Sequence, residues 1–548
     1  MALVGNPLRS EWFGFCFIQD MPSPASLPIL DVNKFDGAIF DLDGVVTQTA
    51  RLHAAAWKQL FDAYLHKHAA KTSSTFHPFD LVTDYRNFVD GKPRYDGVHS
   101  FLSSRGIHLP AGSPSDPQDR ETIYGLGNRK NAFFLATLHT RGVATYPATI
   151  AFIQKLRRIN KKTAVVTASE NYREILEAAH VSNLFDIKVD GQDARTLHLQ
   201  GKPQPDTFLK AAALLDIPPE RAVVFEDALA GVAAGQAGHF GMVVGLDRAD
   251  QSEALHAQGA NLVIEDLEKL ALRDSTGNIW RSAHALPSAI QNSTELISRL
   301  NGKRLVVFLD YDGTLTPIVE RPELAVLPQD TREVLRDLSE RCTVAIISGR
   351  DRPVVEQFIN LDSLIYAGSH GFDIAGPPGL VGHHEIGNQH LPSLNQVEKE
   401  LQLLLPAAPG LLIERKKFSI AVHYRMVAED RVPTVQATIE SIMSRHPDLR
   451  GTEGKKVFEF QPRLDWDKGQ ALLWLLDHLP GAHKDVLPLY IGDDLTDEDA
   501  FRVLMDFGVS IVVENGFRFS CAQYALTGID QVKTFLKDLG QYMKARIA

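Results

Sequence analysis

An acidic phrase that occurs twice in this chain constrains its fold more than any other feature. The segment "FDGAIFDLDGVVTQT" at residues 35–49 recurs in kind as "RLVVFLDYDGTLTPI" at residues 304–318. Each copy is a short apolar run, typical of a buried parallel strand, followed by Asp-x-Asp-Gly and a polar turn. The sequence therefore predicts two related modules, each with an acidic pair at the end of a strand.

Both acidic pairs are followed by the same ordered set of polar residues. Further apolar runs end first in a hydroxyl residue and finally in acids, with a lysine between them. Because open parallel sheets bind ligands at the carboxyl ends of their strands, we expect these groups to converge. Loops commonly supply polar residues for no functional reason, but the same order twice in one chain argues against that reading. The set comprises Thr167, Lys202, Glu226 and Asp227 in the first module, and Ser348, Lys468, Asp493, Asp494 and Asp497 in the second.

Amphipathic helical patterns such as "ATIAFIQKLRRI" and "QALLWLLDHL" alternate with these apolar runs. Alternating strands and helices predict an α/β fold with two Rossmann-like, doubly wound parallel-sheet cores. A chain of 548 residues also exceeds what one hydrophobic core usually organises. We expect a loose tail at residues 1–30, a first module at 31–268, a linker with a short helix at 269–300, and a second module at 301–548.

Composition excludes several classes of protein. A net charge of −11 argues against nucleic acid as a partner, because binding to its backbone depends on lysine and arginine. No stretch reaches the roughly 18 apolar residues that a membrane span needs, and residues 1–30 lack the basic start and long apolar run of a signal peptide. The three cysteines, Cys16, Cys342 and Cys521, lie far apart without metal-ligand spacing. We expect a soluble cytoplasmic protein.

The residues of the second module match the requirements of phosphoryl transfer, which needs a nucleophile, charge neutralisation and a proton for the leaving oxygen. Asp310 would attack phosphorus and form an aspartyl-phosphate, and Asp312 would act as general acid and then general base. Asp310, the backbone carbonyl of Asp312, and Asp493 would hold Mg²⁺, since hard oxygen ligands favour that ion. Ser348 and Lys468 would hold the phosphoryl charge.

The first module offers the matching set for a second Mg²⁺ site, so we expect one ion in each core. Its catalytic candidates are Asp41, Asp43, Thr167 and Lys202, and its metal candidates are Asp41, Asp43, Glu226 and Asp227.

With these motifs, both halves resemble the haloacid dehalogenase superfamily, whose caps differ in position. In the first module 126 positions separate Asp41 from Thr167, which implies a helical cap at about 53–145, after the first motif. In the second, 38 positions separate Asp310 from Ser348 and 120 separate Ser348 from Lys468. This spacing implies an α+β cap at about 375–462, between the second and third motifs.

The C-terminal half resembles the trehalose-6-phosphate phosphatase family through "LDYDGTLTPIV", "SGRD", "YAGSHGFDI", "IERKKFSIAVHYR", "FEFQP", "WDKG" and "YIGDDLTDEDAF". The resemblance implies hydrolysis of trehalose 6-phosphate in trehalose biosynthesis, with Asp494 and Asp497 supporting the metal end. It also implies that Glu414, Lys416 and His423 of the cap face the disaccharide, although a solvated strand would show the same alternation. The other residues that the matching phrases place on the substrate side are Gly349, Arg350, His370, Arg425 and Glu459.

Two departures from the family's commonest form, Gln461 and Leu495, affect the finer substrate preference. Because related caps vary, sucrose phosphate and a glycerate-linked sugar phosphate stay open as alternative substrates.

The N-terminal half resembles the beta-phosphoglucomutase family from about Phe35 to Leu267. Thr49, His53 and Trp57 follow the nucleophile at the family's spacing, and the resemblance implies phosphate and cap contacts for Arg94 and Lys130. Two positions depart from it: Gln48 stands where an acid is expected, and Glu170 stands where a lysine would bind a second phosphate. The module is therefore a mutase, a sugar phosphatase or a non-catalytic scaffold.

Overall fold

The computed structural model describes residues 27–319, 321–405, 408–454, 456–481 and 485–547. Its described residues form two compact units, which we treat separately. The N-terminal unit consists of residues 27–285 together with Phe517–Phe519, and the C-terminal unit contains the rest of residues 286–547. Most of the tail expected at residues 1–30 lies outside the described residues. Among the described helices, none has the length and apolarity needed to cross a membrane.

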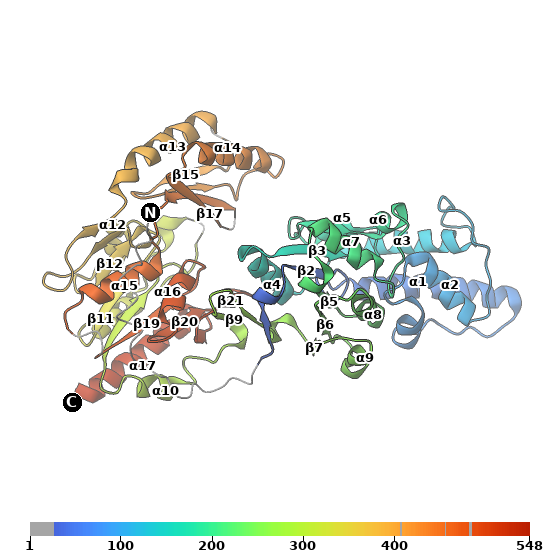
Figure 1. Cartoon of the computed structure of the whole chain (residues 1–548), viewed down its shortest axis with the longest axis horizontal. Coiled ribbons are helices and arrows are strands. Elements are labelled where there is room, and N and C mark those ends of the chain that lie inside the picture. Colours follow the sequence, from blue (N-terminus) through green and yellow to red (C-terminus); the bar gives the residue numbers. More distant parts are fainter. Residues whose placement is uncertain (1–26, 320, 406–407, 455, 482–484, 548) are drawn as a thin grey trace. The chain divides into compact units, whose positions relative to one another are not determined.

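A six-stranded sheet forms the core of the N-terminal unit, with all of its strands parallel. Its central strand β2 is buried along its whole length, because its apolar residues face helices on both sides of the sheet. Helices α4 to α9 cover these faces (Figure 1). The elements are β2 (Gly37–Asp41), β3 (Lys162–Val166), β4 (Ile187–Val189), β5 (Ala222–Glu226), β6 (Met242–Leu246), β7 (Leu262–Ile264), α4 (Pro147–Arg158), α5 (Tyr172–Ala178), α6 (Gly191–Thr196), α7 (Asp206–Leu215), α8 (Leu229–Ala237) and α9 (Ser252–Ala257).

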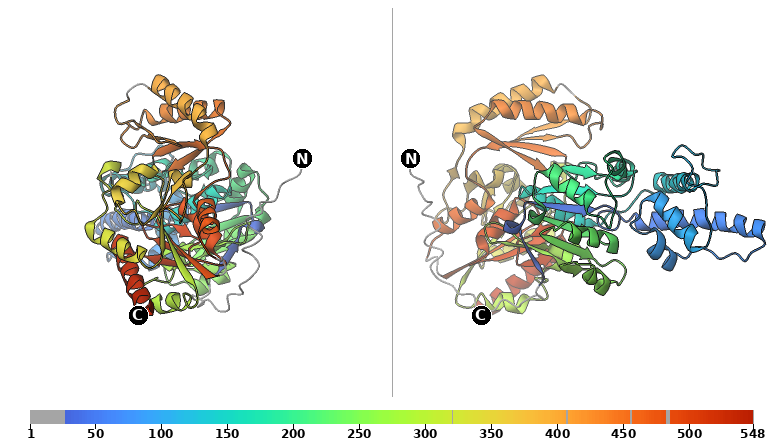
Figure 2. Two further views of the ribbon diagram at one scale, coloured as in Figure 1. Left: turned by 90° about the vertical axis from the view of Figure 1, so that its left-hand side faces the viewer. Right: turned by 45° about the vertical axis from the view of Figure 1, so that its right-hand side comes forward.

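A helical cap interrupts this unit between β2 and α4. It contains α1 (Ala50–Thr72), a π-helical turn (Tyr85–Val89), α2 (Arg94–Ser104) and α3 (Ile123–Arg141). The cap has a core of its own, built largely from stacked and tilted aromatic rings. Figure 2 shows these blue helices at one end of the unit, beyond the sheet.

The segment 269–300, expected as a linker with a short helix, contains two strands as well as that helix. β8 (Ala271–Arg273) and β9 (Ile279–Ser282) form a hairpin in a four-stranded sheet with β1 (Ile29–Asp31) and β21 (Phe519–Ser520), and α10 (Ser293–Ser298) follows. The Asp274 side chain accepts a hydrogen bond of 2.8 Å from Trp280 Nε1 and stabilises the turn. Strands of three or four residues give almost no periodic signal, because they are shorter than the window in which alternation can be recognised.

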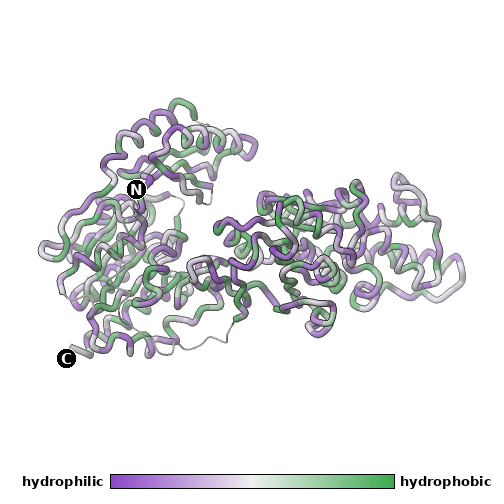
Figure 3. The backbone as a smooth tube through the Cα atoms, viewed as in Figure 1, coloured by the Kyte–Doolittle hydropathy of each residue, from purple (hydrophilic) through white to green (hydrophobic). Residues whose placement is uncertain are grey.

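An eight-stranded sheet forms the core of the C-terminal unit, parallel throughout except at β13 and β14. Figure 3 shows hydrophobic stretches in the interior of each unit, where the core residues lie. The two core sheets confirm the predicted α/β class with parallel-sheet cores. The strands of the eight-stranded sheet are β10 (Arg304–Leu309), β11 (Thr343–Ile347), β12 (Ile365–Gly368), β13 (Asp373–Ala375), β14 (His384–Glu385), β19 (Val486–Gly492), β20 (Val509–Val513) and β22 (Tyr524–Leu526), and its helices are α11 (Gln329–Ser339), α12 (Arg352–Ile359), α15 (Lys468–His478), α16 (Asp497–Leu504) and α17 (Ile529–Ile547).

The cap of the C-terminal unit is a four-stranded antiparallel sheet covered on one face by two helices. Ile420, Val422 and Phe460 pack with these helices in one hydrophobic cluster. Strand residues alternate between faces, so Glu414, His423 and Glu459 occupy the other face. The elements are α13 (Leu391–Leu404), β15 (Leu412–Arg415), β16 (Ile420–His423), α14 (Val432–Arg445), β17 (Leu449–Gly454) and β18 (Val457–Pro462).

Candidate active sites

In the C-terminal unit, a buried lysine joins two acids at the carboxyl end of the sheet. Lys468, the first residue of α15, places its Nζ 2.6 Å from Asp310 Oδ1 and 2.7 Å from Asp497 Oδ1. The hydroxyl of Tyr490 donates a further hydrogen bond of 2.7 Å to Asp497. Burial raises the pKa of Asp310 well above its usual range, although Lys468 opposes the shift. The sequence indicated the lysine and the nucleophile candidate, but it gave no sign of Tyr490.

Three carboxylates form a cluster that could hold a divalent cation. The ligand oxygens of Asp310, Asp493 and Asp497 lie within 4.8 Å of one another. Burial, reinforced by the charge of Asp497, raises the pKa of Asp493 to about 7. A bound cation would relieve this repulsion, so the donor set fits a hard ion such as Mg²⁺. Asn515, which the sequence analysis missed, donates a hydrogen bond of 2.8 Å to Asp493 Oδ2.

The general acid candidate Asp312 is held by a guanidinium fork. Arg350 Nε lies 2.7 Å from Asp312 Oδ2, and Arg350 Nη2 lies 2.6 Å from Asp312 Oδ1. This bidentate geometry fixes the orientation of the carboxylate. Ser348 lies in the same loop, where its Oγ accepts a hydrogen bond of 3.1 Å from the backbone N–H of Arg350. Arg350, one of the substrate-side candidates, is hydrogen-bonded to Asp312 in the structure.

The polar face of the C-terminal cap is organised around Glu459. Its carboxylate lies 3.1 Å from Lys416 Nζ, 2.6 Å from Ser419 Oγ and 3.7 Å from His370 Nε2. His370 belongs to the core and packs against Gly349, where an added Cβ would lie 2.9 Å from the imidazole. These contacts bring the substrate-side candidates His370, Lys416 and Glu459 together.

Two other cap candidates form a pair, and a third lies outside it. His423 Nε2 lies 3.0 Å from Glu414 Oε2, which lowers the pKa of Glu414. Arg425 lies two residues beyond the end of β16 and is exposed. Gln461, one of the departures from the family pattern, donates a hydrogen bond of 3.1 Å to Glu459 Oε2. Its amide therefore supports the same carboxylate as Lys416.

Several contacts join this cap to its core, among them the Lys417–Glu385 ion pair and hydrogen bonds to the carboxylate of Asp351. Asp351 accepts hydrogen bonds of 3.0 and 2.9 Å from the backbone N–H of Lys417, at the turn between β15 and β16. It also accepts a hydrogen bond of 2.7 Å from Ser369 Oγ in the core. We call this set the Asp351 latch. The latch holds the turn between β15 and β16, which contains Lys416, against the loop that contains Ser348 and Arg350.

The N-terminal unit has a corresponding lysine and acid cluster. Lys202 Nζ bonds Asp41 Oδ1 and lies 2.8 Å from Glu226 Oε2. The ligand oxygens of Asp41, Glu226 and Asp227 lie within 4.8 Å of one another. Burial and the charge of Glu226 raise the pKa of both Asp41 and Asp227. This cluster also fits a divalent cation.

The two clusters are related by position, although the sequence analysis paired their acids differently. A Cβ on Gly44 would lie 1.9 Å from Asp227 Oδ2, and one on Gly313 would lie 2.0 Å from Asp493 Oδ2, so Asp227 and Asp493 correspond. Glu226, the last residue of β5, then corresponds to Gly492, the last residue of β19. The acid that pairs with the lysine therefore comes from the strand in one unit and from α16, as Asp497, in the other.

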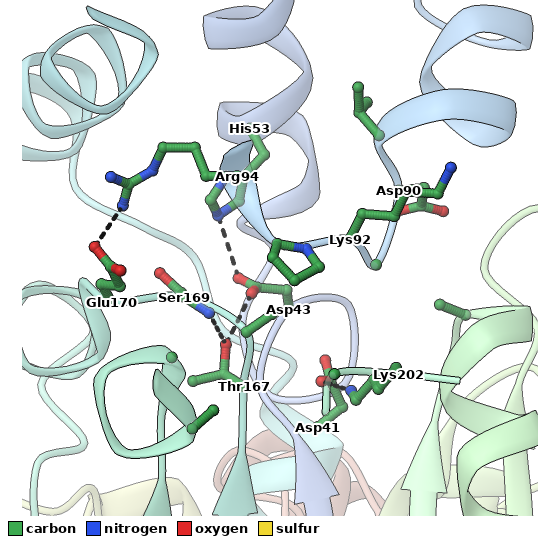
Figure 4. Close-up of a pocket in the computed structure, with 18 of the residues that line it drawn as sticks. Asp41, Asp43, His53, Asp90, Lys92, Arg94, Thr167, Ser169, Glu170 and Lys202 are labelled. Atoms are coloured by element: carbon green, nitrogen blue, oxygen red, sulfur yellow. Dashed lines mark hydrogen bonds and ion pairs between the residues drawn. The ribbon is translucent and has the colours of Figure 1, made fainter. Parts of the chain in front are cut away.

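The acid and base candidate of the N-terminal unit, Asp43, is held by polar neighbours (Figure 4). Thr49 donates a hydrogen bond to Asp43, Thr167 Oγ1 lies 3.3 Å from Asp43 Oδ2, and His53 Nε2 lies 3.6 Å from Asp43 Oδ1. Burial alone would raise the pKa of Asp43, but the bonds from His53 and Thr49 lower it to about 2. Lys130 Nζ lies 2.6 Å from His53 Nδ1, and burial lowers the pKa of Lys130 to about 7.

These residues line a cavity of about 320 Å³ between the helical cap and the sheet. Figure 4 shows Asp41 and Lys202 at one side, and Arg94 and Glu170 away from them. Glu170 Oε2 lies 3.3 Å from Arg94 Nη2, and Arg195 of α6 bonds the other oxygen of Glu170. The sequence analysis considered Arg94 and Glu170 separately and missed Arg195, which falls in a short helix without a motif.

Comparison with known proteins supports the family resemblance of each half of the chain. The trehalose-phosphatase family matches residues 308–527, and the haloacid dehalogenase-like hydrolases match residues 35–239. A trehalose-phosphate phosphatase of Mycobacterium tuberculosis is 40% identical over 343 residues, covering 62% of this chain and 86% of that protein. A beta-phosphoglucomutase of Mycobacterium bovis is 47% identical over 240 residues, covering 43% of this chain and 92% of that protein.

A longer relative matches both halves at once. An uncharacterised glycosyl hydrolase of Mycobacterium tuberculosis is 38% identical over 518 residues, or 93% of this chain, and the match covers 38% of that protein. The chain thus spans well under half the length of this relative. The comparisons confirm the resemblance of each half, and the chain belongs to the haloacid dehalogenase-like phosphatases, with a trehalose-phosphatase domain in its C-terminal half and a beta-phosphoglucomutase-like domain in its N-terminal half.

Proposed function

We propose that the C-terminal unit hydrolyses trehalose 6-phosphate to trehalose and inorganic phosphate, as a step of trehalose biosynthesis. One observation carries the proposal. The Asp310 and Lys468 pair lies in a core that the Asp351 latch joins to a polar cap face, in a chain that is 40% identical over 343 residues to a trehalose-phosphate phosphatase.

The reaction uses residues that the fold holds in place. Asp310 attacks phosphorus and forms an aspartyl-phosphate while Asp312 gives its proton to the leaving sugar oxygen. Asp312 then takes a proton from the water that breaks the aspartyl-phosphate. Lys468 and Ser348 hold the phosphoryl oxygens throughout. Because Asp312 must first carry a proton, substrate binding draws Arg350 toward the phosphate and loosens the fork on Asp312.

A Mg²⁺ ion held by Asp310, Asp493 and the backbone carbonyl of Asp312 would neutralise the charge between the nucleophile and the phosphate dianion. Asp497 supports the metal end through Lys468 and through its place in the same cluster.

Selection of the sugar falls to the cap. Trehalose offers only hydroxyl groups, so a site that recognises it depends on hydrogen bonds more than on apolar shape. The Glu414–His423 and Lys416–Glu459 pairs present both donors and acceptors on one face. A substrate without matching hydroxyls would cover these charged pairs without supplying hydrogen bonds to their remaining donors and acceptors, which weakens its binding.

Phosphate release by the full chain from trehalose 6-phosphate, sucrose 6-phosphate and glucose 6-phosphate tests this proposal. We expect the first to be the best substrate and Asp310→Asn to abolish its turnover. If Asp310→Asn leaves that turnover intact, the nucleophile lies elsewhere and the proposal fails. A preference for sucrose 6-phosphate would be consistent with the proposed chemistry but would change the proposed substrate.

A second candidate function, phosphoryl transfer on a hexose phosphate, is favoured for the N-terminal unit. Its Asp41, Lys202 and Glu226 contacts are complete, and Mg²⁺ would again be held at the acid cluster. A non-catalytic scaffold would have no need of such a set. Turnover of hexose phosphates in an Asp310→Asn background, lost when Asp41→Asn is added, would exclude the scaffold; no turnover would favour it.

A further inference from the structure

The end of the N-terminal cavity away from Asp41 holds a carboxylate between two guanidinium groups. Arg94 comes from the cap at the start of α2, Arg195 from α6 of the core, and Glu170 from the loop after β3. Glu170 uses one oxygen for each arginine. The Arg94 and Glu170 side chains are 13% and 28% exposed, so this ion pair is partly shielded from water. One carboxylate therefore serves both guanidinium groups, which lowers the net charge of the set from +2 to +1.

The other lysines that line the cavity do not provide a spare cation at this end. Lys130 Nζ is held 2.6 Å from His53 Nδ1 and lies over the rings of Trp57 and Phe134. Lys92 Nζ turns to Ser100 of the cap, 3.0 Å away. Lys202 belongs to the nucleophile at the opposite end. An anion bound beside Arg94 would have to displace Glu170 or accept its repulsion.

This arrangement bears on which acceptor receives the phosphoryl group. A mutase that moves a phosphate between two positions of a sugar passes through a bisphosphate, whose second phosphate lies away from the nucleophile. A binding site for it is strongest where the cations are not shared with a carboxylate. The neutral end of a monophosphate needs only hydrogen-bond donors and acceptors, which the Arg94–Glu170–Arg195 set provides.

We propose that Glu170 makes the N-terminal unit selective for sugars that carry a single phosphate, so that the phosphoryl group passes to water and the unit acts as a sugar phosphatase. The proposal rests on the aspartate chemistry proposed for this unit. Asp41 forms a bond to phosphorus as the bond to the sugar oxygen breaks, and that oxygen takes a proton from Asp43. Water then attacks phosphorus, the bond to Asp41 breaks, and the water proton passes to Asp43.

Binding to the full chain with both nucleophiles replaced, Asp41→Asn and Asp310→Asn, tests the selectivity independently of turnover. The probes are glucose 6-phosphate and glucose 1,6-bisphosphate, measured by calorimetry. Glu170→Lys should tighten bisphosphate binding by about 10- to 100-fold and leave monophosphate binding within about threefold. Glu170→Gln, which removes the charge without adding one, should give a smaller gain. Glu177→Lys, an exposed change of the same charge on α5, is the matched control and should change neither affinity.

The proposal is overturned if Glu170→Lys and Glu170→Gln both leave bisphosphate affinity unchanged, or if Glu177→Lys raises it equally. Thermal melting of each variant identifies any that fails to fold, in which case Glu170→Gln decides. In turnover assays, the Asp310→Asn chain, which keeps Asp41, should release phosphate from a hexose monophosphate faster than it interconverts the 1- and 6-phosphates. The reverse order would make the unit a mutase and refute the selectivity. Loss of all turnover with selectivity intact would overturn the proposed chemistry alone.

Discussion

The lysines of the two units, Lys202 and Lys468, are paired with acids that come from different elements. In the N-terminal unit the strand supplies Glu226, and the residue opposite it on the next helix is Gly231, where a Cβ would lie 2.1 Å from the Glu226 carboxyl carbon. In the C-terminal unit the strand ends at Gly492, where a Cβ would lie 2.3 Å from the carboxyl carbon of Asp497. The space beside the lysine holds one carboxylate. The element that does not supply this carboxylate, the helix in the N-terminal unit and the strand in the C-terminal unit, has a glycine at the facing position.

The candidate acid and base residues differ in the same way. Asp43 is held by an imidazole and two hydroxyls, whereas Asp312 is held by the fork of Arg350. In both units the fold therefore determines where a charged group must lie beside the catalytic residues, while the residue and the element that supply this group can differ. Four experiments would break or sharpen this comparison.

The nucleophiles should be strictly separate in function. Asp310→Asn should reduce trehalose 6-phosphate turnover by about 10⁴-fold or more, because an amide cannot form the acyl phosphate. Asp41→Asn should leave that turnover within about twofold. Phosphate release by the full chain measures both. Equal losses in the two variants would mean that the units do not act independently.

The acid that pairs with the lysine should function from either the strand or the helix. Asp497→Gly leaves the buried Lys468 with one acid, so we expect kcat to fall by about 10²- to 10³-fold and the free energy of unfolding to fall by about 3 kcal/mol. Adding Gly492→Glu to Asp497→Gly copies the N-terminal arrangement and should restore at least about tenfold of the lost kcat.

Steady-state kinetics and urea unfolding of the single and double variants measure this coupling. Gly492→Glu alone is the control and should be destabilising, because its side chain meets Asp497. Additive losses in the double variant would show that the two positions are not equivalent.

Cap attachment should matter more for large substrates than for small ones. Asp351→Ala removes the acceptor of the Lys417 N–H, so we expect KM for trehalose 6-phosphate to rise about tenfold. Turnover of p-nitrophenyl phosphate, which needs no sugar contacts, should stay within about twofold. Glu356→Ala, on the neighbouring α12, provides a control. A parallel loss with both substrates would mean that Asp351 supports the core instead of the cap.

The raised pKa of Asp493 should give a pH-dependent stability when metal is chelated. Its pKa is about 7 in the folded state against a usual value of 3.8. The folded state then binds the proton more tightly, so the free energy of unfolding falls as pH rises from the usual value to about 7 and levels off above. Lowering the pH from about 8 to about 6 should stabilise the C-terminal unit by about 1 kcal/mol.

Urea unfolding in the presence of a chelator measures this effect, and Asp493→Asn should remove it. Magnesium should stabilise the protein more at the higher pH, since the ion and the proton compete for the same carboxylate. A pH dependence that survives in Asp493→Asn would assign the effect to other acids.

The sequence allowed the α/β class and the family of each half to be predicted, because buried parallel strands read as apolar runs and the polar groups follow them directly. Contacts made by isolated residues could not be predicted. Tyr490 lies inside a strand, and Asn515 and Arg195 fall outside any motif, so nothing in the local pattern relates them to distant acids. The equivalence of Glu226 and Asp497 was also hidden, since it depends on strand register and not on the order of acids.

The assignment of Phe517–Phe519 to the N-terminal unit has a practical consequence for dissecting the protein. The Phe519 ring lies 5.4 Å from that of Phe152, and the backbone N–H of Ala283 donates a hydrogen bond of 2.9 Å to the carbonyl of Arg518. A gene truncated after residue 285 would encode an N-terminal half without this segment and with Phe152 newly uncovered. Expression of separate halves would therefore need the short peptide grafted back, for example as an extension of β9 through a designed turn.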